Sequence, residues 1–589
     1  MIESLRCCVR PLSSGIGLAL VLAAFAAGDE PAKTSPADFV LLGGKVATGD
    51  AKRTVASAIA IRGEKIVYVG ADEGARALVG PKTQVYEAQG RTVIPGLNET
   101  HVHAIGVAQG EVVQPFRQLG SIAEIQEWVR GQAAKAKEGE WIRLPRVDVT
   151  RIRERRLPTR EELDAAAPRQ PTVFIWQYAN RQLQVLNTAA LKAAGITRDT
   201  PAPRGGKIVK DEAGEPTGVL DDAPSLTSKW LPRTEVLPEQ VLDSLEKVLG
   251  HYNRLGITSI TERGSNVAGW KTYRQLRSKD RLTVRATVTI RVGSDGSVAG
   301  TERFIRDLPF RFREGDDWVR VGPLKLAVDG GVLYGTAFLR EPYGDKAQSL
   351  YRLTDPQFRG LLQLDSAKVQ NIIRTGHRLG WQMCSHVTGD AGVDIVLDAV
   401  EAAHRDSSLA DRRFTLIHAY FANAEAAARA AKLGVCVDTQ PAWYYKDGDA
   451  LAQALGGARM QKFIGLAEWR KAGVNVALNS DHMQGVDPDL SLNPYNPFLT
   501  MYVAVSRKTE SGAVLGADQR ISREDALRMM TRDAAYQHFD EASRGTLEVG
   551  KLGDLAVLSA DYFTCPEEEI KNLRAVLTVV GGKVVFRAK

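Results

Sequence analysis

The chain has 589 residues, of which 44% are hydrophobic and 25% are charged, and its formal net charge is +7 at pH 7. This composition is ordinary for a globular protein and excludes a disordered or fibrous chain. The length allows one large domain with a smaller companion. The positive charge is small for a surface of this size, and acidic residues interrupt the arginine-rich stretch at 151–160, so we expect no nucleic-acid partner.

The first residues are typical of an export signal. Arg6 and Arg10 precede an uncharged, mostly apolar run at 15–28 that ends in small residues suited to cleavage. This run is shorter than the about 20 residues that span a bilayer. We predict that residues 1–28 are a signal peptide and that the protein is exported (periplasmic or secreted), with no stable membrane span after cleavage. An uncleaved anchor and a misassigned start are the alternatives.

Both ends of the remaining chain show short strand patterns around glycine-containing turns. FVLLGGKV at 39–46 is one example, and VLTVVGGKVVF at 576–586 is another. Such patterns are typical of β-hairpins. We predict that 36–94 and 545–589 together build one small composite β-sandwich; two unrelated hairpins are the alternative.

The central region, 95–544, alternates strand-like and helical runs. Alternation of this kind indicates an α/β protein with a parallel sheet, and closure into a (β/α)8 TIM barrel is the natural solution. An excess of residues at about 110–250 is interpreted as an insertion that caps the barrel mouth. The eight strand-like runs are 92–94, 172–176, 258–261, 324–328, 382–385, 415–417, 435–438 and 474–478.

The strongest chemical signal is the His-x-His pair in VIPGLNETHVH, formed by His101 and His103. A strand and a Pro-Gly turn precede the pair. On an extended backbone, residues i and i+2 point to the same side, so both imidazoles can converge on one metal ion. We predict that both histidines are metal ligands.

Three further side chains follow later strands. His386 in WQMCSHVTGD and His418 in FTLIHAY end consecutive strand-like runs, and Asp481 in VNVALNSDH lies just past the eighth. Active sites of barrels lie where the strands end, so we predict that all three are ligands. Alone, each histidine would be interpreted as structural, and a loop cap is the alternative for Asp481.

Lys325 lies within the apolar run VGPLKLAVDGG. A buried free lysine is costly. A lysine carbamylated by carbon dioxide is instead an anionic oxygen ligand that can bridge two metals. The alternative is an ordinary lysine paired with Asp329 or another acid.

These motifs together resemble the amidohydrolase superfamily, and within it amidohydrolase family 3, the branch that includes N-substituted formamide deformylase-like proteins. The matching motifs are VIPGLNETHVH, LKLAVDGG, HVTGD, IHA, NSD and the tail GTLEVGKLGDLAVLSAD, and the resemblance covers about 36–589. Two departures stand out. Asn98, Glu99 and Thr100 replace the family's usual "IDS" before the His-x-His pair, and the stretch 180–186 lacks a histidine that the family often has there.

The resemblance implies a hydrolase of carbon–nitrogen bonds other than peptide bonds, acting on small amide, N-acyl or N-formyl amine substrates. One or two divalent metal ions, with zinc as the first choice, would activate a water molecule. Asp481 would relay its proton to the leaving amine, with His482 as the alternative carrier. Asp329 and Asp390 are candidate acceptors that orient the histidine ligands.

Two other functions stay open at this point. Hydrolysis of esters or cyclic amides would use the same site, and a non-catalytic metal-binding protein would keep the metal but not the chemistry. No nucleotide-binding motif supports a cofactor-dependent oxidoreductase. The sequence leaves open whether the protein forms a homo-oligomer.

Overall fold

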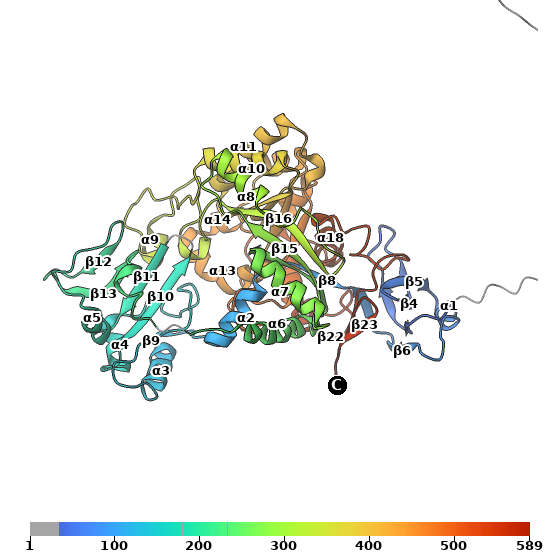
Figure 1. Ribbon diagram of the computed structural model, residues 1–589, viewed down its shortest axis with the longest axis horizontal. Helices are drawn as coiled ribbons and strands as arrows, with labels where there is room; N and C mark the ends of the chain where they lie inside the picture. The colour runs from blue at the N-terminus through green and yellow to red at the C-terminus, as the bar shows by residue number, and fades with distance from the viewer. Residues whose placement is uncertain (1–34, 179–180, 232–233) are drawn as a thin grey trace, which may run out of the picture.

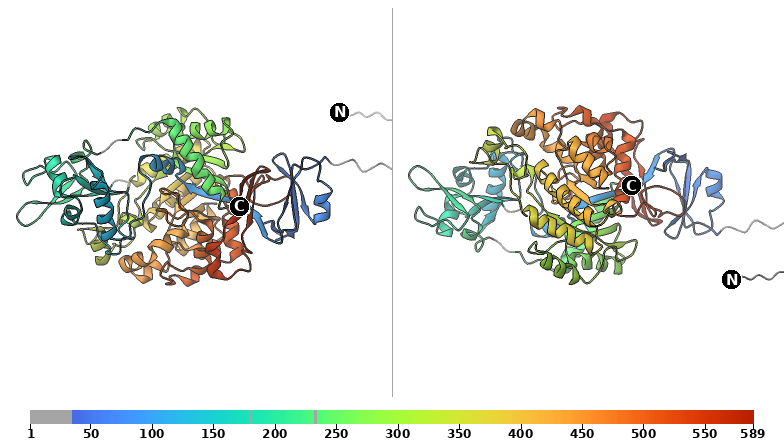
Figure 2. Two further views of the ribbon diagram at one scale, coloured as in Figure 1. Left: turned by 90° about the horizontal axis from the view of Figure 1, so that it is seen from below. Right: turned by 90° about the horizontal axis from the view of Figure 1, so that it is seen from above.

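The protein is described by a computed structural model over residues 35–178, 181–231 and 234–589. The predicted signal peptide, residues 1–28, lies outside these residues. Within them, no helix is both long and apolar enough to cross a membrane. A central α/β body carries an inserted sheet at one end and smaller β-sheets at the other (Figures 1 and 2).

The central body is a barrel of eight parallel strands, which confirms the predicted fold class. Its two edge strands meet where Val102 pairs in parallel with His482 and the N–H of His103 donates to the His482 carbonyl at 2.9 Å. In order around the barrel the strands are β8 (Leu97–Val102), β14 (Ile257–Ser265), β15 (Arg285–Arg291), β16 (Val319–Ala327), β17 (Met383–Val387), β18 (Thr415–His418), β19 (Cys436–Thr439) and β20 (Val476–Leu478).

Two of the eight strand-like runs were wrongly expected in the barrel. The run 92–94 belongs to β7 (Thr92–Pro95) of a terminal sheet, and 172–176 belongs to β10 (Thr172–Tyr178) of the insertion. Their barrel places are taken by β8 and β15, with the sequences LNETHV and RATVTIR. These strands carry polar side chains because those side chains point into the barrel, where the site and its supports lie. Hydrophobic patterning therefore does not reveal β8, whereas β15 shows the apolar–polar alternation of a strand but no continuous apolar run.

Helices follow the strands and pack around the barrel (Figure 1). Some are amphipathic, as α11 illustrates with its buried Val393, Val396, Leu397 and Val400 at helical spacing, whereas α16 is buried on nearly all sides. The helices are α2 (Ala104–Val113), α6 (Pro238–Asn253), α7 (Val267–Ser278), α8 (Val298–Arg306), α10 (Ser366–Arg378), α11 (Asp390–Asp406), α12 (Ala424–Lys432), α13 (Pro441–Leu455), α15 (Leu466–Lys471), α16 (Pro497–Ser506), α17 (Arg523–Met529) and α18 (Arg532–Gln537).

Two sheets beside the barrel share one apolar core that includes Phe39, Ile59, Val93 and Leu577. One sheet comes from the N-terminal segment and the other from both chain ends, because β7 pairs antiparallel with β21. The first contains β5 (Lys65–Gly70), β4 (Ala58–Arg62), β1 (Phe39–Leu42) and β6 (Gln84–Glu87); the second contains β23 (Lys583–Arg587), β22 (Ala575–Val580), β21 (Leu555–Leu558), β7, β2 (Lys45–Ala47) and β3 (Val55–Ala56).

A single glycine joins these sheets to the barrel. Gly96 lies between β7 and β8, and a Cβ atom there would come within 2.2 Å of the Thr258 hydroxyl oxygen. Only glycine, which has no Cβ atom, permits so close an approach of the chain at Gly96 to Thr258 of β14. The start of β8, and with it the histidine pair, is thereby held against β14.

The insertion forms its own sheet and contacts the barrel on the side where the strands end. The Arg151 guanidinium pairs with Asp447 of α13 at 2.8 Å, and Arg181 donates to the Tyr351 carbonyl of α9 (Asp345–Tyr351) at 2.8 Å. Both α9 and α13 follow barrel strands. The insertion comprises α3 (Ile122–Ala133), β9 (Ile142–Arg143), α4 (Arg160–Ala166), β10, β11 (Arg181–Leu186), α5 (Thr188–Ala194), β12 (Lys207–Lys210) and β13 (Pro216–Asp221).

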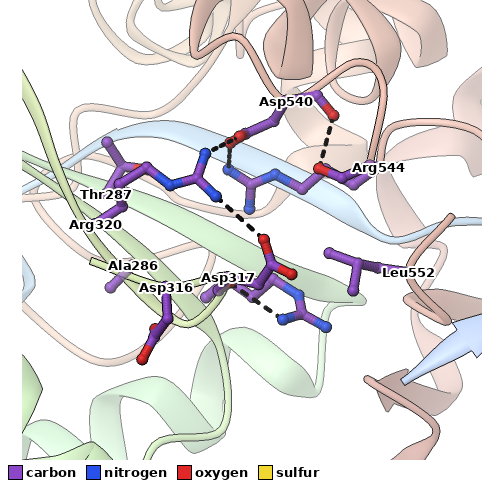
Figure 3. A pocket seen from close by; sticks show the side chains of 10 residues that line it. Ala286, Thr287, Asp316, Asp317, Arg320, Asp540, Arg544 and Leu552 are labelled. Carbon is purple, nitrogen blue, oxygen red and sulfur yellow. Dashed lines mark hydrogen bonds and ion pairs between the residues drawn. The ribbon is translucent and has the colours of Figure 1, made fainter. Parts of the chain in front are cut away.

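The opposite end of the barrel, where β15 and β16 begin, is closed by paired charges. Arg285 is buried and its Nε lies 2.7 Å from Asp554. Asp540 lies between Arg320 and Arg544 and forms ion pairs with both (Figure 3). These ion pairs join this end of the barrel, which we call the floor, to the C-terminal segment of the chain.

Candidate metal centre

The His-x-His pair sits inside the barrel on β8. The Nε2 atoms of His101 and His103 lie 3.3 and 3.2 Å from the same carboxylate oxygen, Oδ1 of Asp481. The alternation of a strand brings both rings to one side, as predicted. Glu99 on the same strand accepts the N–H of Ser480 at 2.9 Å, which fixes β8 against the segment that carries Asp481.

Asp481 follows β20 and supplies the third ligand atom of this group. Its Oδ1 is buried and accepts no hydrogen bond from any residue that the structure describes. A buried carboxylate oxygen without a donor is costly unless a cation satisfies it. The ligand atoms of His101, His103 and Asp481 lie within 4.8 Å of one another. This donor set fits a divalent metal ion.

Lys325 lies beside this group on β16. Its side chain is only 8% exposed, and its Nζ lies 3.3 Å from His101 Nε2. Across the described ranges, no carboxylate forms an ion pair with it within 4.0 Å. Burial lowers the pKa of Lys325 to about 8, so the uncharged amine is readily reached.

His386 on β17 and His418 on β18 complete the cluster. Their ring centroids are 4.6 Å apart, and the centroid of His418 is 5.4 Å from that of His101. Burial lowers the pKa of His101 and His418 well below its ordinary value and that of His386 to about 3. These imidazoles are therefore neutral, which is the form that binds metals.

The tautomer of His418 is fixed by an amide chain that sequence reasoning missed. Its Nδ1 lies 2.7 Å from Oε1 of Gln440, whose Nε2 donates to Asn479 Oδ1 at 2.7 Å. Asn479 in turn donates to Asp438, which pairs with Arg263 at 2.9 Å. Because the Asp438 carboxylate accepts, the amide nitrogen of Asn479 must face it, and the amide oxygen of Asn479 must face Gln440. The amide oxygen of Gln440 then faces His418, so Nδ1 of His418 donates. Its Nε2 is then available to a metal.

Three of these supporting residues share a signal that the sequence did contain. Asp438, Gln440 and Asn479 are polar, fully buried, and lie at or just after the ends of β19 and β20. The same strand-end rule that found the histidines applies to them. Their orienting role depends on contacts between strands, however, and no sequence spacing gives those contacts.

The two aspartates proposed as histidine acceptors lie at the edge of the cluster. Asp329 accepts the N–H groups of Thr388, Gly389 and Phe338 at 2.8–2.9 Å, and its Oδ1 is 3.8 Å from His386 Nε2, longer than a hydrogen bond. Burial raises the pKa of Asp329 to about 7. Asp390 begins α11 and accepts the N–H of Arg340 at 2.9 Å. In the structure, both order the loops around β17.

His482, the alternative proton carrier, does not face the cluster with a free nitrogen. Its Nδ1 lies 2.8 Å from the Tyr252 hydroxyl, and its Nε2 lies 2.7 Å from the Gly485 carbonyl. Its ring also stacks on Tyr495, with centroids 4.1 Å apart. Both nitrogens thus have hydrogen-bond partners within the protein, so His482 packs between α6 and the loop that follows β20.

A cavity of about 200 Å³ opens onto the cluster at the strand ends. It reaches all six predicted ligand residues, the four histidines, Lys325 and Asp481. Its other walls are formed by Gly264, Arg291, Leu326, Ala327, Gln363 and Met483. The cavity gives a small molecule access to the candidate ligand atoms.

Comparisons with known proteins find relatives that match nearly the whole chain. The chain is 28% identical to the N-substituted formamide deformylase of Arthrobacter pascens, over 93% of this chain and 98% of that protein. It is 27% identical to the protein LONG AFTER FAR-RED 3 of Arabidopsis thaliana, over 93% and 92% of the two chains. Among solved structures, an uncharacterized metal-dependent hydrolase from Pyrococcus horikoshii OT3 shares the fold, with a TM-score of 0.65 at 20% identity, over 90% and 99% of the chains.

The family model described as the amidohydrolase family matches residues 84–586, which span the barrel, the insertion and the terminal strands β6, β7, β21, β22 and most of β23. The resemblance found in the motifs is thereby confirmed. This chain belongs to the amidohydrolase family.

Proposed function

We propose that this protein hydrolyses carbon–nitrogen bonds other than peptide bonds, in small amide, N-acyl or N-formyl amine substrates, with the help of a bound metal. The observation that carries the proposal is the buried Oδ1 of Asp481, which faces two imidazole Nε2 atoms and accepts no hydrogen bond in the described part of the chain. The likeness to a formamide deformylase over nearly the whole of both chains supports the bond class.

The residues that would hold the metal are His101, His103, Lys325, His386, His418 and Asp481. Imidazole and carboxylate ligands suit Zn²⁺, in a site of one or two ions. A bound ion of this kind lowers the pKa of water and polarises a carbonyl. The barrel contributes the rest, because it holds neutral imidazoles at fixed positions around a small cavity.

Asp481 is proposed as the proton carrier. Its Oδ1 faces the cavity, where the attacking water and the leaving amine would both lie. The carboxylate takes a proton from the water at this oxygen and delivers it to the departing nitrogen. Asp481 is favoured over His482, whose two ring nitrogens have hydrogen-bond partners in Tyr252 and Gly485.

Lys325 is proposed to be carbamylated. Its uncharged amine would attack carbon dioxide, forming an N–C bond and releasing one proton to solvent. Burial and the lowered pKa of Lys325 support this step. Lys325→Ala should lose metal and activity, with partial rescue by short carboxylic acids. Carbon-13 NMR of protein equilibrated with labelled bicarbonate should show a carbamate signal; an unmodified amine in fully active enzyme would rule the modification out.

The test of the proposed function is metal analysis of the purified protein followed by a substrate panel. We expect one to two equivalents of divalent metal, loss of activity on chelation, and recovery on adding Zn²⁺. The panel should contain N-formyl and N-acyl amines, cyclic amides and matched esters. Turnover of esters alone, or of nothing by fully metal-loaded protein, would contradict the proposed bond class.

We also propose that residues 1–28 direct export. The support is the arginine-led apolar run with small residues at its end. N-terminal sequencing of the mature protein from the exported fraction should begin close to Ala27. A mature protein that starts at Met1 would contradict cleavage.

A further inference from the structure

One charged side chain in the cavity wall is not used by the chemistry described so far. Arg291 is the last residue of β15, is exposed, and lines the same cavity as the metal-ligand cluster. In the described ranges it forms no ion pair or side-chain hydrogen bond. The other arginines of β14, β15 and β16 are paired, Arg263 with Asp438, Arg285 with Asp554 and Arg320 with Asp540.

Arg291 is fixed close to the cluster by the sheet. In the parallel register it is the partner of Lys325, and the N–H of Val292 donates to the Lys325 carbonyl at 2.9 Å. Adjacent strands lie about 4.8 Å apart. A permanent cation therefore stands beside the ligand atoms.

The remaining wall favours a small substrate with one polar end. Gln363 is held by donation to the Asp329 carbonyl at 2.5 Å, while Ala327 and Met483 are apolar. A volume of about 200 Å³ lies below the range common for drug-sized ligands. Asp481 is the only carboxylate among the described residues that line this cavity, and it belongs to the metal group. An anionic ligand would thus meet Arg291 without a competing acid beside it.

We propose that Arg291 is a specificity-determining residue that binds a carboxylate of the substrate. The preferred substrates are then N-formylated or N-acylated amino acids rather than neutral amides. This inference rests on the proposed function. A guanidinium binds a carboxylate through two parallel hydrogen bonds, which orients as well as attracts. With the carboxylate at Arg291, the scissile carbon–nitrogen bond is directed toward Lys325, His101 and Asp481.

The test compares matched substrates that differ by one charge. N-formylglycine and N-acetylglycine are paired with their primary amides, and release of formate or acetate is measured in metal-loaded enzyme. We expect kcat/KM to favour the acids, and Arg291→Gln to lower kcat/KM for the acids by about 10- to 100-fold. The same variant should change kcat/KM for the amides less than about threefold, with unchanged metal content. Arg291→Lys should keep part of the preference.

The matched control is Arg303→Gln, which removes an exposed positive charge from α8 outside the cavity. It should leave the preference unchanged, which separates a local contact from general electrostatic attraction. Equal rates for acids and amides in wild-type enzyme, or equal losses for both in Arg291→Gln, would overturn the role of Arg291 while leaving the hydrolase proposal intact.

A binding measurement separates the two proposals if no substrate is turned over. Calorimetry of N-acetylglycine and N-acetylglycinamide with metal-loaded Asp481→Asn protein, with and without Arg291→Gln, reads carboxylate recognition without catalysis. Tighter binding of the acid that depends on Arg291 would support the inference even if the hydrolase proposal fails. Equal binding of both compounds would overturn it.

Discussion

The two ends of the barrel use buried charge in opposite ways. At the floor, Arg285 and Asp554 are buried against each other, and Asp540 is shared by two arginines (Figure 3). At the end where the strands finish, Asp481 Oδ1 is buried without a hydrogen bond from any described residue, and Lys325 lacks an acidic partner there. The same strands thus carry satisfied charges at one end and unsatisfied ones at the other.

Three non-glycine residues near the ligand atoms have an unusual backbone conformation. His418, Ala419 and Asp481 have φ values of 79°, 43° and 51°, in the left-handed region that L-residues rarely adopt. Each such residue costs about 1–3 kcal/mol and persists only where the surrounding fold imposes it. All three lie at the strand ends beside the cavity. The two ends therefore differ in charge pairing: the floor stabilises the fold, whereas the opposite end holds ligand atoms that no other described residue satisfies.

The largest effect should come from removing a ligand at the cavity end. His101→Asn or His103→Asn should release at least one metal ion and lower kcat/KM by more than about 10⁴-fold, because water activation and carbonyl polarisation are lost together. Thermal unfolding of the metal-free proteins should change little. Elemental analysis and melting curves check both points. Wild-type metal content and activity in both variants would place the site elsewhere.

Asp481→Asn tests the proton carrier rather than the metal. The amide keeps the shape but loses the basic oxygen, so kcat should fall by about 10²–10⁴-fold. Metal content should fall far less than in the histidine variants, since several ligands remain. Initial rates under metal saturation measure this. A loss of kcat below about threefold would assign Asp481 a structural role.

Arg285→Ala tests the floor. Removing the guanidinium leaves Asp554 buried without its cation, which costs about 3–5 kcal/mol of the free energy of unfolding. The folded fraction should keep its metal content and kcat/KM. A double-mutant cycle measures this, with denaturant unfolding of Arg285→Ala, Asp554→Ala and the double variant. The double variant should recover part of the free energy of unfolding that each single variant loses. A change in kcat/KM without a change in the free energy of unfolding would show that the floor also influences the candidate metal site.

The ligand residues could be predicted from the sequence because each one ends a strand of an alternating pattern. His386 and His418 follow apolar runs, and His101 and His103 share one side of an extended segment. Two barrel strands differ from this pattern. β8, with the sequence LNETHV, is mostly polar and lacks the hydrophobic signal of a buried strand. β15, with the sequence RATVTIR, alternates apolar and polar residues but lacks the continuous apolar run that indicates a fully buried strand.

Side-chain partners were the least predictable level. The position of His482 next to Asp481 favoured a catalytic role, but alternation along the chain turns its ring toward Tyr252 and Gly485 instead. Asp329 lies near the ligands in sequence, yet three backbone N–H groups occupy it. The hydrogen-bond partner of a buried group depends on how several strands pack together. A short stretch of sequence around that group does not contain this information.

Gln440 should give the smallest effect at the cavity end, because it acts through His418. Gln440→Met keeps a similar volume but cannot accept the Nδ1–H of His418, so the imidazole loses the contact that fixes its tautomer. Loss of such an orienting partner typically weakens metal binding by about 10- to 100-fold. Competition with a chelator should show that weakening, while thermal unfolding of the metal-free protein shifts little. Gln440→Glu is the matched control, since its carboxylate still accepts the Nδ1–H and should retain most of the affinity. Equal affinity in Gln440→Met and wild type would show that the amide only packs, and that the Tyr420 hydroxyl, 3.1 Å from the same nitrogen, is sufficient to orient the ring.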